Sequence, residues 1–358
     1  MRLTGDFLSP GAFALLMAPF APFENHPVLA VAVSGGRDSL ALALLANDWA
    51  EARGGAIVAL IVDHGLRAAA AREAEVTREL LARRGIEAAI LRWSGAKPTH
   101  GLQEAARAAR YGLLFEACRE RDILHLLVAH HADDQAETVA MRAARGSGAD
   151  GLAGMAAPVE QRHARLLRPL LPVPRAWLTA TLEALGAAWI DDPSNADPRF
   201  ERVRLRTAGG IEPHDEQAGG RRAGRESRLA RAAVEVLEID DELGLDRASF
   251  GRLGAGLKAG LLSRAVQAVG GRDHPPRRER LERAVDRLCE AAMRGKSGKR
   301  QDFTLAECRL MLRQAPSSRR LRWIVRPENG KGNDRNEGQP LVPAAFFACG
   351  GLLPPHVD

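Results

Sequence analysis

The sequence predicts an α/β protein with a Rossmann-like parallel sheet, followed by a smaller C-terminal α+β domain. Three observations lead to this prediction. Short apolar runs alternate with helix-type runs through the first half of the chain, as in strand–helix–strand units. The pattern changes beyond Asp150. The length, 358 residues, exceeds the usual size of one domain.

The first-half elements follow one another in a regular order. Val28 to Val33 is a continuous apolar run, which suits a strand buried on both faces. A helix is expected to open at Asp133 and Asp134, whose carboxylates suit the positive end of a helix dipole. Between them we expect, in order, a helix at 40–52, a strand at 57–62, a helix at 72–84, a strand at 88–93, a helix at 103–121 and a strand at 123–129.

The second half predicts a different organisation. We expect helices at 174–185, 229–237 and 276–293, and strands at 302–313 and 320–325. The Gly-, Arg- and Glu-rich stretch between 207 and 227 lacks apolar periodicity and is interpreted as a linker. The expected division is an α/β domain with a helical extension at 1–206, a linker at 207–227, a C-terminal domain at 228–326 and a loosely ordered tail at 327–358.

Composition excludes several classes of protein. An aromatic share of 4% disfavours binding modules that stack bases on many rings. The four cysteines include no C-x-x-C pair, which disfavours a zinc ribbon or an iron–sulfur cluster. No signal peptide or membrane span is visible, so we expect a cytosolic protein. The net charge of +6 suggests a polyanionic partner, but an Arg-rich genome composition explains it equally well.

Three polar clusters fall just past the carboxyl ends of predicted parallel strands. They are Ser34 to Ser39, Asp63-His64, and His130 to Glu137. In open α/β sheets this edge is where ligands bind. The sequence therefore predicts one ligand site assembled from the three clusters.

The first cluster, Ser34-Gly35-Gly36-Arg37-Asp38-Ser39, is suited to gripping nucleotide phosphates. Its small residues let backbone N–H groups approach a polyphosphate at a helix N-terminus. The two serines can add hydroxyl donors, and Asp38 can hold Mg²⁺. The hexapeptide matches neither the Walker P-loop nor the G-x-G-x-x-G fingerprint. An ordinary strand-to-helix turn is the alternative.

At this motif the sequence resembles the PP-loop ATP pyrophosphatases. Further segments, in the same order, resemble the signatures of the tRNA(Ile)-lysidine synthase family. They are Val62-Asp63-His64-Gly65-Leu66-Arg67, Gln103 to Tyr111, Ala129 to Thr138, Arg145-Gly146-Ser147-Gly148, Leu167-Arg168-Pro169-Leu170 and Asp191-Asp192-Pro193-Ser194-Asn195. Weaker echoes follow at 304–309 and 323–327.

The resemblance implies an ATP-dependent ligase that forms a carbon–nitrogen bond. Its substrates are L-lysine and the tRNA(Ile) with anticodon CAU, whose wobble cytidine is adenylated and then joined to lysine. AMP and pyrophosphate are released. The resemblance also implies that 228–326 binds tRNA. The oligomeric state is open, with a homodimer as one option.

Roles for individual residues follow from the resemblance and their chemistry. Asp38 with Mg²⁺, and Arg107 or Arg110, would neutralise the α-phosphate. Ser34 to Ser39, with Asp63 and His64, would bind ATP. Asp134 and Glu137, at i and i+3, would hold the ammonium groups of lysine. His130 would act as general base on the amine or contact phosphate.

Each assignment has a plainer alternative. The two arginines could be solvated charges, Asp133 or Asp134 could cap the helix while Glu137 is solvated, Asp63 and His64 could merely end a strand, and His130 could be structural. The chain also has Arg202-Val203 where family members commonly show Arg-Asn. The rival functions are another PP-loop enzyme, such as a tRNA 2-thiocytidine synthetase, and a non-catalytic tRNA-binding protein.

Overall fold

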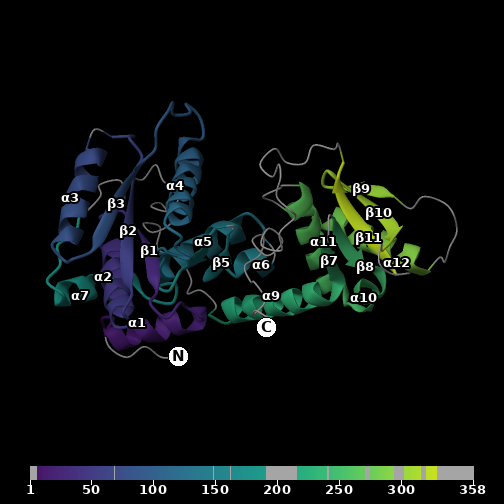
Figure 1. Ribbon diagram of the computed structural model, residues 1–358, viewed down its shortest axis with the longest axis horizontal. Coiled ribbons are helices and arrows are strands. Elements are labelled where there is room, and N and C mark those ends of the chain that lie inside the picture. Colours follow the sequence, from purple (N-terminus) through teal and green to yellow (C-terminus); the bar gives the residue numbers. More distant parts are fainter. Residues whose placement is uncertain are drawn as a thin grey trace. The chain divides into compact units, whose positions relative to one another are not determined.

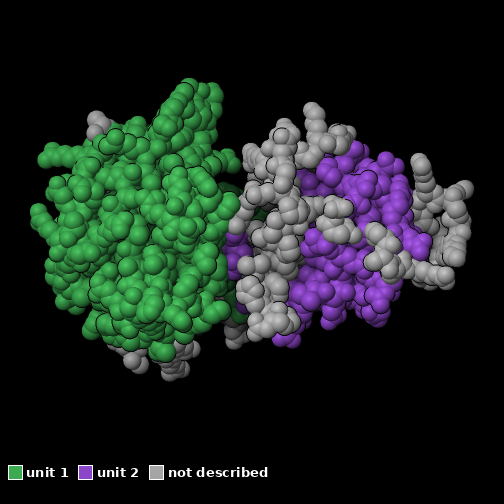
Figure 2. Space-filling view, viewed as in Figure 1, with its two compact units in different colours: residues 1–158, 163–220 green, residues 159–162, 221–358 purple. Residues whose placement is uncertain are grey.

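The chain divides into two compact units, which Figure 2 shows in green and purple. Unit 1 comprises 1–158 and 163–220, and unit 2 comprises 159–162 and 221–358. In the computed structural model, the described residues are 6–67, 69–147, 149–161, 163–190, 216–239, 242–270, 275–293, 302–315 and 320–328.

The parallel strands of unit 1 belong to a six-stranded sheet in the order β3-β2-β1-β4-β6-β5, whose edge strand β5 is divided between the two units after Pro158. The pairings of β1 with β2, β1 with β4, β2 with β3, and β4 with β6 are all parallel. The strands are β1 (Val28–Val33), β2 (Ala56–Asp63), β3 (Glu87–Arg92), β4 (His125–Leu127), β5 (Pro158–Glu160) and β6 (Arg165–Leu167). The Rossmann-like parallel sheet predicted from the alternating pattern is confirmed.

Helices cover both faces of this sheet. Helix α2 contacts β1 and β2, helix α3 contacts β2 and β3, and α4 packs on the other side, as Figure 1 shows. The helical elements of unit 1 are α1 (Pro10–Met17), the 3₁₀ turn η1 (Ala18–Phe20), α2 (Arg37–Glu51), α3 (Ala70–Ala82), α4 (Leu102–Glu120), α5 (Ala132–Ala144), α6 (Ala149–Leu152) and α7 (Arg175–Ala184).

The core of unit 1 explains why β1 reads as a continuous apolar run. Leu29, Val31 and Val33 are buried in one hydrophobic cluster with residues of α2, and Ala30, on the opposite face of the strand, is also fully buried. A strand covered on both faces has no reason to alternate apolar with polar residues. Helix α1, which the sequence analysis did not predict, adds Phe13 and Met17 to the same cluster.

Unit 2 contains an antiparallel sheet of five strands in the order β7-β8-β11-β10-β9. Its core centres on Trp323, which is 1% exposed, and on Phe250 and Leu310. Helix α9 begins in unit 1 and continues into unit 2. The elements are α9 (Glu216–Val236), β7 (Leu237–Ile239), β8 (Leu243–Asp246), α10 (Arg247–Arg252), α11 (Ala255–Gly270), α12 (Arg278–Met293), β9 (Phe303–Leu305), β10 (Cys308–Gln314) and β11 (Leu321–Pro327).

The structure differs from the sequence prediction in three places. The stretch expected as a linker at 207–227 is helical from Glu216, because its Arg, Glu and Ala residues favour helix and Leu229 and Ala233, further along α9, are buried. The single strand expected at 302–313 is a hairpin, β9 and β10. The strand expected at 123–129 is reduced to β4. Residues 207–215 and the tail beyond Glu328 lie outside the described residues.

None of the described helices has the length and apolar character needed to cross a membrane.

Candidate active site

The sheet of unit 1 has a switch point between β1 and β4. From β1 the chain continues to β2 on one side, whereas β4 pairs with the opposite side of β1. Ser34 directly follows β1, and His130 and His131 follow β4. Open α/β sheets bind ligands beyond the carboxyl ends of their strands at such a point. We call Ser34 to Ser39 together with His130 to Glu137 the switch-point site.

The turn after β1 is held by its two serines. The Ser34 amide donates to Ser39 Oγ at 3.1 Å, and Ser39 Oγ donates to the Gly36 carbonyl at 3.0 Å. Gly36 is the N-cap of α2 and, as a glycine, brings no capping side chain to the first amides of the helix. The positive end of α2 therefore has N–H groups available for an anion, as the sequence predicts for a phosphate-binding turn.

Gly35 is required by the shape of this turn. Its φ of +83° lies in the left-handed region, and a Cβ there would stand 2.4 Å from Thr77 Oγ1. Thr77 is itself fixed, because its hydroxyl donates to the Glu73 carbonyl at 2.8 Å. The amide of Ile190 donates to the Gly35 carbonyl at 3.0 Å. The turn is therefore packed between α3 and the segment after α7.

Arg37 and Asp38 reach α7 from the first turn of α2. The Arg37 guanidinium donates to Thr179 Oγ1 at 3.2 Å and lies 5.8 Å from the centre of the Trp189 ring. Arg175, the first residue of α7, places Nε 3.4 Å from Asp38 Oδ1. Arg37 thus serves the packing of the turn, and Arg175 adds a positive charge at Asp38.

His131 joins the two halves of the switch-point site. Its ring is 2% exposed, and Nε2 lies 3.6 Å from Asp38 Oδ2 and 3.4 Å from Asp134 Oδ2. On the other side of the ring, Nδ1 lies 3.7 Å from Asp133 Oδ1. One buried imidazole therefore contacts three carboxylates, one from α2 and two from α5.

These contacts shift the pKa values of both partners. Burial would raise the pKa of Asp38, but the hydrogen bond and charge of His131, with the charge of Arg175, outweigh it and lower the pKa. Burial would lower the pKa of His131, but Asp38, Asp134 and Asp133 outweigh it and raise the pKa. Both shifts favour the charged form of each group, a carboxylate on Asp38 and an imidazolium on His131.

The two acids proposed to hold lysine have different surroundings. Asp134 accepts a hydrogen bond from the His131 amide at 3.2 Å, which is a helix-capping contact. Glu137, one turn further along α5, is 0% exposed and is not the solvated side chain of the alternative interpretation. Asp133 accepts from the Arg175 amide at 3.2 Å and is half-exposed. Helix capping thus explains the presence of a carboxylate at Asp134, but it does not explain the buried carboxylate of Glu137.

Arg107 and Arg110 flank Tyr111, the single tyrosine of the chain. Their guanidinium carbons lie 5.1 and 5.2 Å from the centre of its ring, within the range of cation–π attraction. Burial would raise the pKa of Tyr111, but the charges of Arg110, Arg107 and Arg168 outweigh it and lower the pKa. Arg107 is exposed and Arg110 is partly buried, and both guanidinium groups lie near the aromatic ring.

Buried polar atoms without partners collect around this ring. The Tyr111 hydroxyl, Arg110 Nε and His64 Nδ1 have no hydrogen-bond partner among the described residues. Burial lowers the pKa of His64, and the charge of Arg110 lowers it further. A buried polar group without a partner costs free energy, so such groups call for a ligand or ordered water.

His130 accepts a hydrogen bond from Arg168, which directly follows β6. Arg168 Nε donates to His130 Nδ1 at 3.2 Å, and Arg168 also donates to the Ala156 carbonyl at 2.7 Å. Because Nδ1 accepts this bond, the proton of a neutral His130 ring lies on Nε2. The ring therefore presents a donor at Nε2.

The chain is similar in sequence to proteins of known family. Residues 13–209 match the PP-loop domain family, an ATP-binding domain. The tRNA(Ile)-lysidine synthase of Rhodopseudomonas palustris is 42% identical over 77% of this chain and 84% of its own length. That of Bradyrhizobium sp. is 42% identical over 75% of this chain and 81% of its own length.

The chain belongs to the tRNA(Ile)-lysidine synthase family. Among solved structures, it is similar to a U34-tRNA thiolase from Methanococcus maripaludis, with a TM-score of 0.43 and 18% identity over 57% of this chain and 80% of that chain.

Residues from the family signatures of this lysidine synthase homologue lie in the switch-point site and around Tyr111. The segments from Val62, Gln103, Ala129 and Leu167 supply His64, Arg110, His131 and Arg168, respectively. Asp63 is buried and accepts a hydrogen bond from the Gly65 amide at 2.9 Å, which shapes the turn after β2. The segment from Asp191 to Asn195 and the Arg202-Val203 departure lie outside the described residues.

Four residues of the site were not singled out from the sequence. The sequence analysis gave His130 a role and gave none to its neighbour His131. Tyr111 and Arg168 are part of the signature segments, but the sequence analysis gave them no role. Their contacts with Arg107, Arg110 and His130 are visible only in the structure. Arg175 follows Pro174 at a predicted helix start, where nothing local indicates an approach to Asp38.

Proposed function

We propose that this protein is a tRNA(Ile)-lysidine synthase, a ligase that joins L-lysine to C2 of the wobble cytidine in the CAU anticodon of tRNA(Ile). In the first step, the C2 oxygen attacks the α-phosphorus of ATP and pyrophosphate leaves. In the second step, the ε-amine of lysine attacks C2, the C2–O bond breaks and AMP leaves with that oxygen. The amine loses its protons to form lysidine.

The observation that carries the proposal is the contact between Asp38 and His131. It joins a phosphate-binding turn to a helix bearing carboxylates, so ATP and a cationic amino acid can be held at one switch point. A purely RNA-binding protein has no use for Asp38, Asp134 and Glu137 at this edge, because carboxylates repel a polyanion.

For the adenylation step, positive groups approach the phosphates from two directions. The N-terminus of α2 offers amides at Ser34 to Ser39. Arg107 and Arg110 are positioned by Tyr111 to neutralise charge on the α-phosphate. His130, whose Nδ1 accepts from Arg168, can donate from Nε2 to a phosphate oxygen, which favours the phosphate-contact role over that of general base.

Asp38 fits a magnesium ion that arrives with ATP. Mg²⁺ at nucleotide sites is usually bound through one or two carboxylates together with substrate phosphates. The lowered pKa of Asp38 keeps its carboxylate ionised beside the phosphate turn. When bound, the ion would supply charge neutralisation at the phosphates.

For the second step, Glu137 and Asp134 are the groups suited to lysine. Glu137 is fully buried, so a carboxylate there would meet an ammonium group away from water, where their attraction is strong. Asp134 is already used by the His131 amide but has a second oxygen. We assign Glu137 the larger share of lysine recognition.

The sulfur-transferring alternative has no support from the described cysteines. Cys118 lies in unit 1 and is buried, whereas Cys289, which is partly buried, and Cys308, which is buried, lie in unit 2. Burial raises the pKa of Cys118 to about 11, so its thiol stays protonated at neutral pH and is a poor nucleophile.

A single incubation tests the proposal. The protein is mixed with ATP, labelled lysine and an unmodified tRNA(Ile) transcript with anticodon CAU, and a methionine tRNA with the same anticodon serves as control. We expect label in the tRNA(Ile) alone, with AMP and pyrophosphate formed in step. Absence of label from the RNA, with no AMP produced, would reject the lysidine reaction.

A further inference from the structure

Arg175, the first residue of α7, occupies one oxygen of Asp38. Its Nε lies 3.4 Å from Asp38 Oδ1, and His131 Nε2 lies 3.6 Å from Oδ2. Asp38 stands in the first turn of α2, next to the amides of the phosphate turn. Each oxygen of the carboxylate that we assign to magnesium therefore already has a basic partner from outside α2.

The two partners differ in how firmly they are held. The His131 ring is 2% exposed and also contacts Asp134 and Asp133, so it is fixed from both sides. The Arg175 side chain is 28% exposed and has no ion pair with a second carboxylate among the described residues. Its distance of 3.4 Å from Asp38 is also longer than the roughly 2.7–2.9 Å of a strong charge-assisted hydrogen bond. Arg175 is therefore the partner that can leave Asp38 at the lower cost.

The backbone that carries Arg175 is fixed at the site. The Arg175 amide donates to Asp133 Oδ1 at 3.2 Å, and the Ala132 amide donates to the Val173 carbonyl at 2.9 Å. Further along α7, Leu178 is fully buried in the core. The start of α7 thus stays beside α5 and the phosphate turn, while the long side chain of Arg175 can change its direction by rotation about its own bonds.

Asp38 Oδ1 is also the oxygen that a magnesium ion can take. Mg²⁺ at nucleotide sites is bound through one or two carboxylates together with substrate phosphates. His131 covers Oδ2 from a buried position, so Oδ1 is the oxygen left for the ion. A guanidinium and a dication on one oxygen repel each other. The Arg175 side chain must therefore leave Asp38 when ATP and its ion bind, and it does so next to the phosphates.

We propose that Arg175 is a pyrophosphate-binding residue, which pairs with Asp38 in the free protein and moves to the β- and γ-phosphates when ATP binds. This role rests on the adenylation step of the proposed function, in which the bond between the α-phosphorus and the α–β bridging oxygen breaks and pyrophosphate leaves with the electron pair. A guanidinium suits this leaving group because its planar donors match two phosphate oxygens at once. Arg175 neutralises the charge that develops on pyrophosphate, whereas Arg107 and Arg110 serve the α-phosphate.

Binding of the two fragments of ATP tests this role without catalysis. Calorimetry with the full-length protein and Mg²⁺ measures the Kd of inorganic pyrophosphate and of AMP, each alone. Arg175→Gln should raise the Kd of pyrophosphate by about 10-fold or more, as expected when one charged phosphate contact is lost. The Kd of AMP should change by less than about twofold, because AMP lacks the β- and γ-phosphates. An unchanged Kd of pyrophosphate, or an equal rise for AMP, would overturn the proposal.

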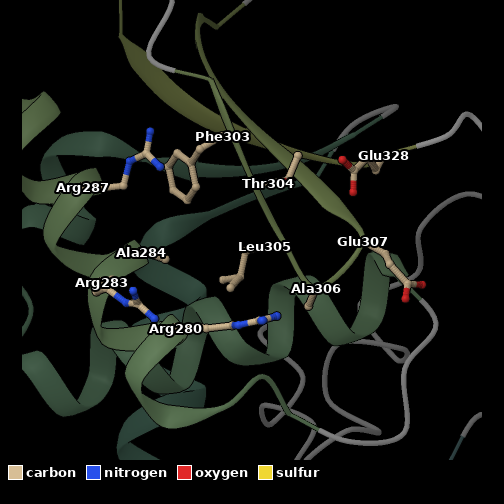
Figure 3. Close-up of a pocket in the computed structure, with 10 residues that line it drawn as sticks. All are labelled: Arg280, Arg283, Ala284, Arg287, Phe303, Thr304, Leu305, Ala306, Glu307 and Glu328. Carbon is tan, nitrogen blue, oxygen red and sulfur yellow. The ribbon is translucent and has the colours of Figure 1, made fainter.

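Pyrophosphate could also bind to a second group of cations. Figure 3 shows three arginines of α12, Arg280, Arg283 and Arg287, which line a cavity of about 490 Å³ in unit 2 together with Phe303. Arg283→Gln is therefore the control for binding outside the switch-point site, and it should change the Kd of pyrophosphate by less than about twofold. A rise in Arg283→Gln as large as that in Arg175→Gln would place pyrophosphate in this cavity and contradict the role of Arg175.

Competition for Asp38 Oδ1 has a separate readout. Mn²⁺ serves as a paramagnetic probe of the magnesium position in the absence of nucleotide, and electron paramagnetic resonance measures its free fraction. Arg175→Gln removes the competing cation and should lower the Kd of Mn²⁺ by about threefold or more, whereas Asp38→Asn/Arg175→Gln should lose this gain. A Mn²⁺ Kd that is unchanged or higher in Arg175→Gln would contradict the exchange at Oδ1.

A conservative variant separates charge from folding. Arg175→Lys keeps the cation and should bind pyrophosphate within about threefold of the wild type, since lysine also binds phosphate as a point charge. A loss as large as that of Arg175→Gln would contradict a phosphate-binding role.

None of these binding measurements requires tRNA or lysine. If the wild type incorporates no lysine, the lysidine reaction is wrong, while the Kd values of pyrophosphate, AMP and Mn²⁺ still decide the role of Arg175. If lysine is incorporated, Arg175→Gln should lower the rate of adenylation at saturating ATP and tRNA on the order of 100-fold. An unchanged rate would contradict a role in the departure of pyrophosphate.

Discussion

The Nε2 atom of His131 lies 3.6 Å from Oδ2 of Asp38, which places a residue after β4 against the first turn of the helix after β1. The contact spans the switch point of the sheet. It keeps Asp38 ionised and oriented beside the phosphate turn, and it sets the start of α5, where Asp134 and Glu137 follow.

Replacing Asp38 should stop adenylation and spare RNA binding. Asp38→Asn removes the charge that we assign to Mg²⁺ and phosphate orientation, and losses on the order of 100-fold or more in AMP release are expected. Asp133→Asn is the control, since it contacts the same imidazole from a half-exposed position. AMP release measures adenylation, and the Kd for tRNA measures RNA binding. A large loss of tRNA binding in Asp38→Asn would mean that Asp38 is structural.

The ion pair of Asp38 and His131 should make stability depend on pH. The raised pKa of His131 means that its contribution is complete below the usual value of 6.5 and is lost as the pH rises through the higher folded value. The lowered pKa of Asp38 gives a contribution that is present above 3.8 and is lost as the pH falls through the lower folded value.

Unfolding in urea at several pH values measures this. The stability difference between wild type and His131→Gln should be larger at pH 6 than at pH 9. A difference that is constant, or that grows with pH, would contradict a protonated His131.

The turn after β1 should not tolerate a side chain at Gly35. Gly35→Ala combines the cost of a positive φ, roughly 1 kcal/mol, with a steric overlap on Thr77 Oγ1, which typically adds 1–3 kcal/mol. Gly85→Ala is the matched control, because Gly85 has φ +74° and open space around a Cβ. Urea unfolding measures the loss of stability, and ATP binding measures whether the turn still binds the nucleotide. Equal stability losses, with ATP affinity unchanged in both, would show that the close packing of Gly35 is unimportant.

The Tyr111 ring should matter more for activity than for folding. Tyr111→Leu removes the ring that positions Arg107 and Arg110, and we expect adenylation to fall by about 10-fold, comparable to a 1–2 kcal/mol cation–π contribution. Tyr111→Phe keeps the ring and removes a hydroxyl that has no partner among the described residues, so stability should be unchanged or slightly higher. Equal activity in the Leu and Phe variants would argue against positioning by the ring.

The sequence predicts those features of the fold that depend on neighbouring residues. The parallel sheet follows from apolar runs such as β1, and the turn from β1 into α2 follows from the small residues of Ser34 to Ser39 at the end of that run. The partners of Asp38 could not be predicted, because Arg175 and His131 reach it only through the packing of α7 and α5. The part of helix α9 before Leu229 was not predicted because glycines interrupt its pattern, whereas the part from Leu229 onward was predicted as a helix.

In the switch-point site, we assign Asp38 to adenylation and Glu137 to lysine binding. Labelling from [α-³²P]ATP tests this division most directly. Wild type without lysine should form adenylated tRNA, and lysine should then discharge the label as AMP. Asp38→Asn should form no adenylated tRNA. Glu137→Gln should form it at a near wild-type rate and require on the order of 10- to 100-fold more lysine to discharge it, as expected when one partner of a buried charge pair is lost. If Glu137→Gln blocks adenylation as fully as Asp38→Asn does, the two halves are not separate and the assignment of Glu137 to lysine is wrong.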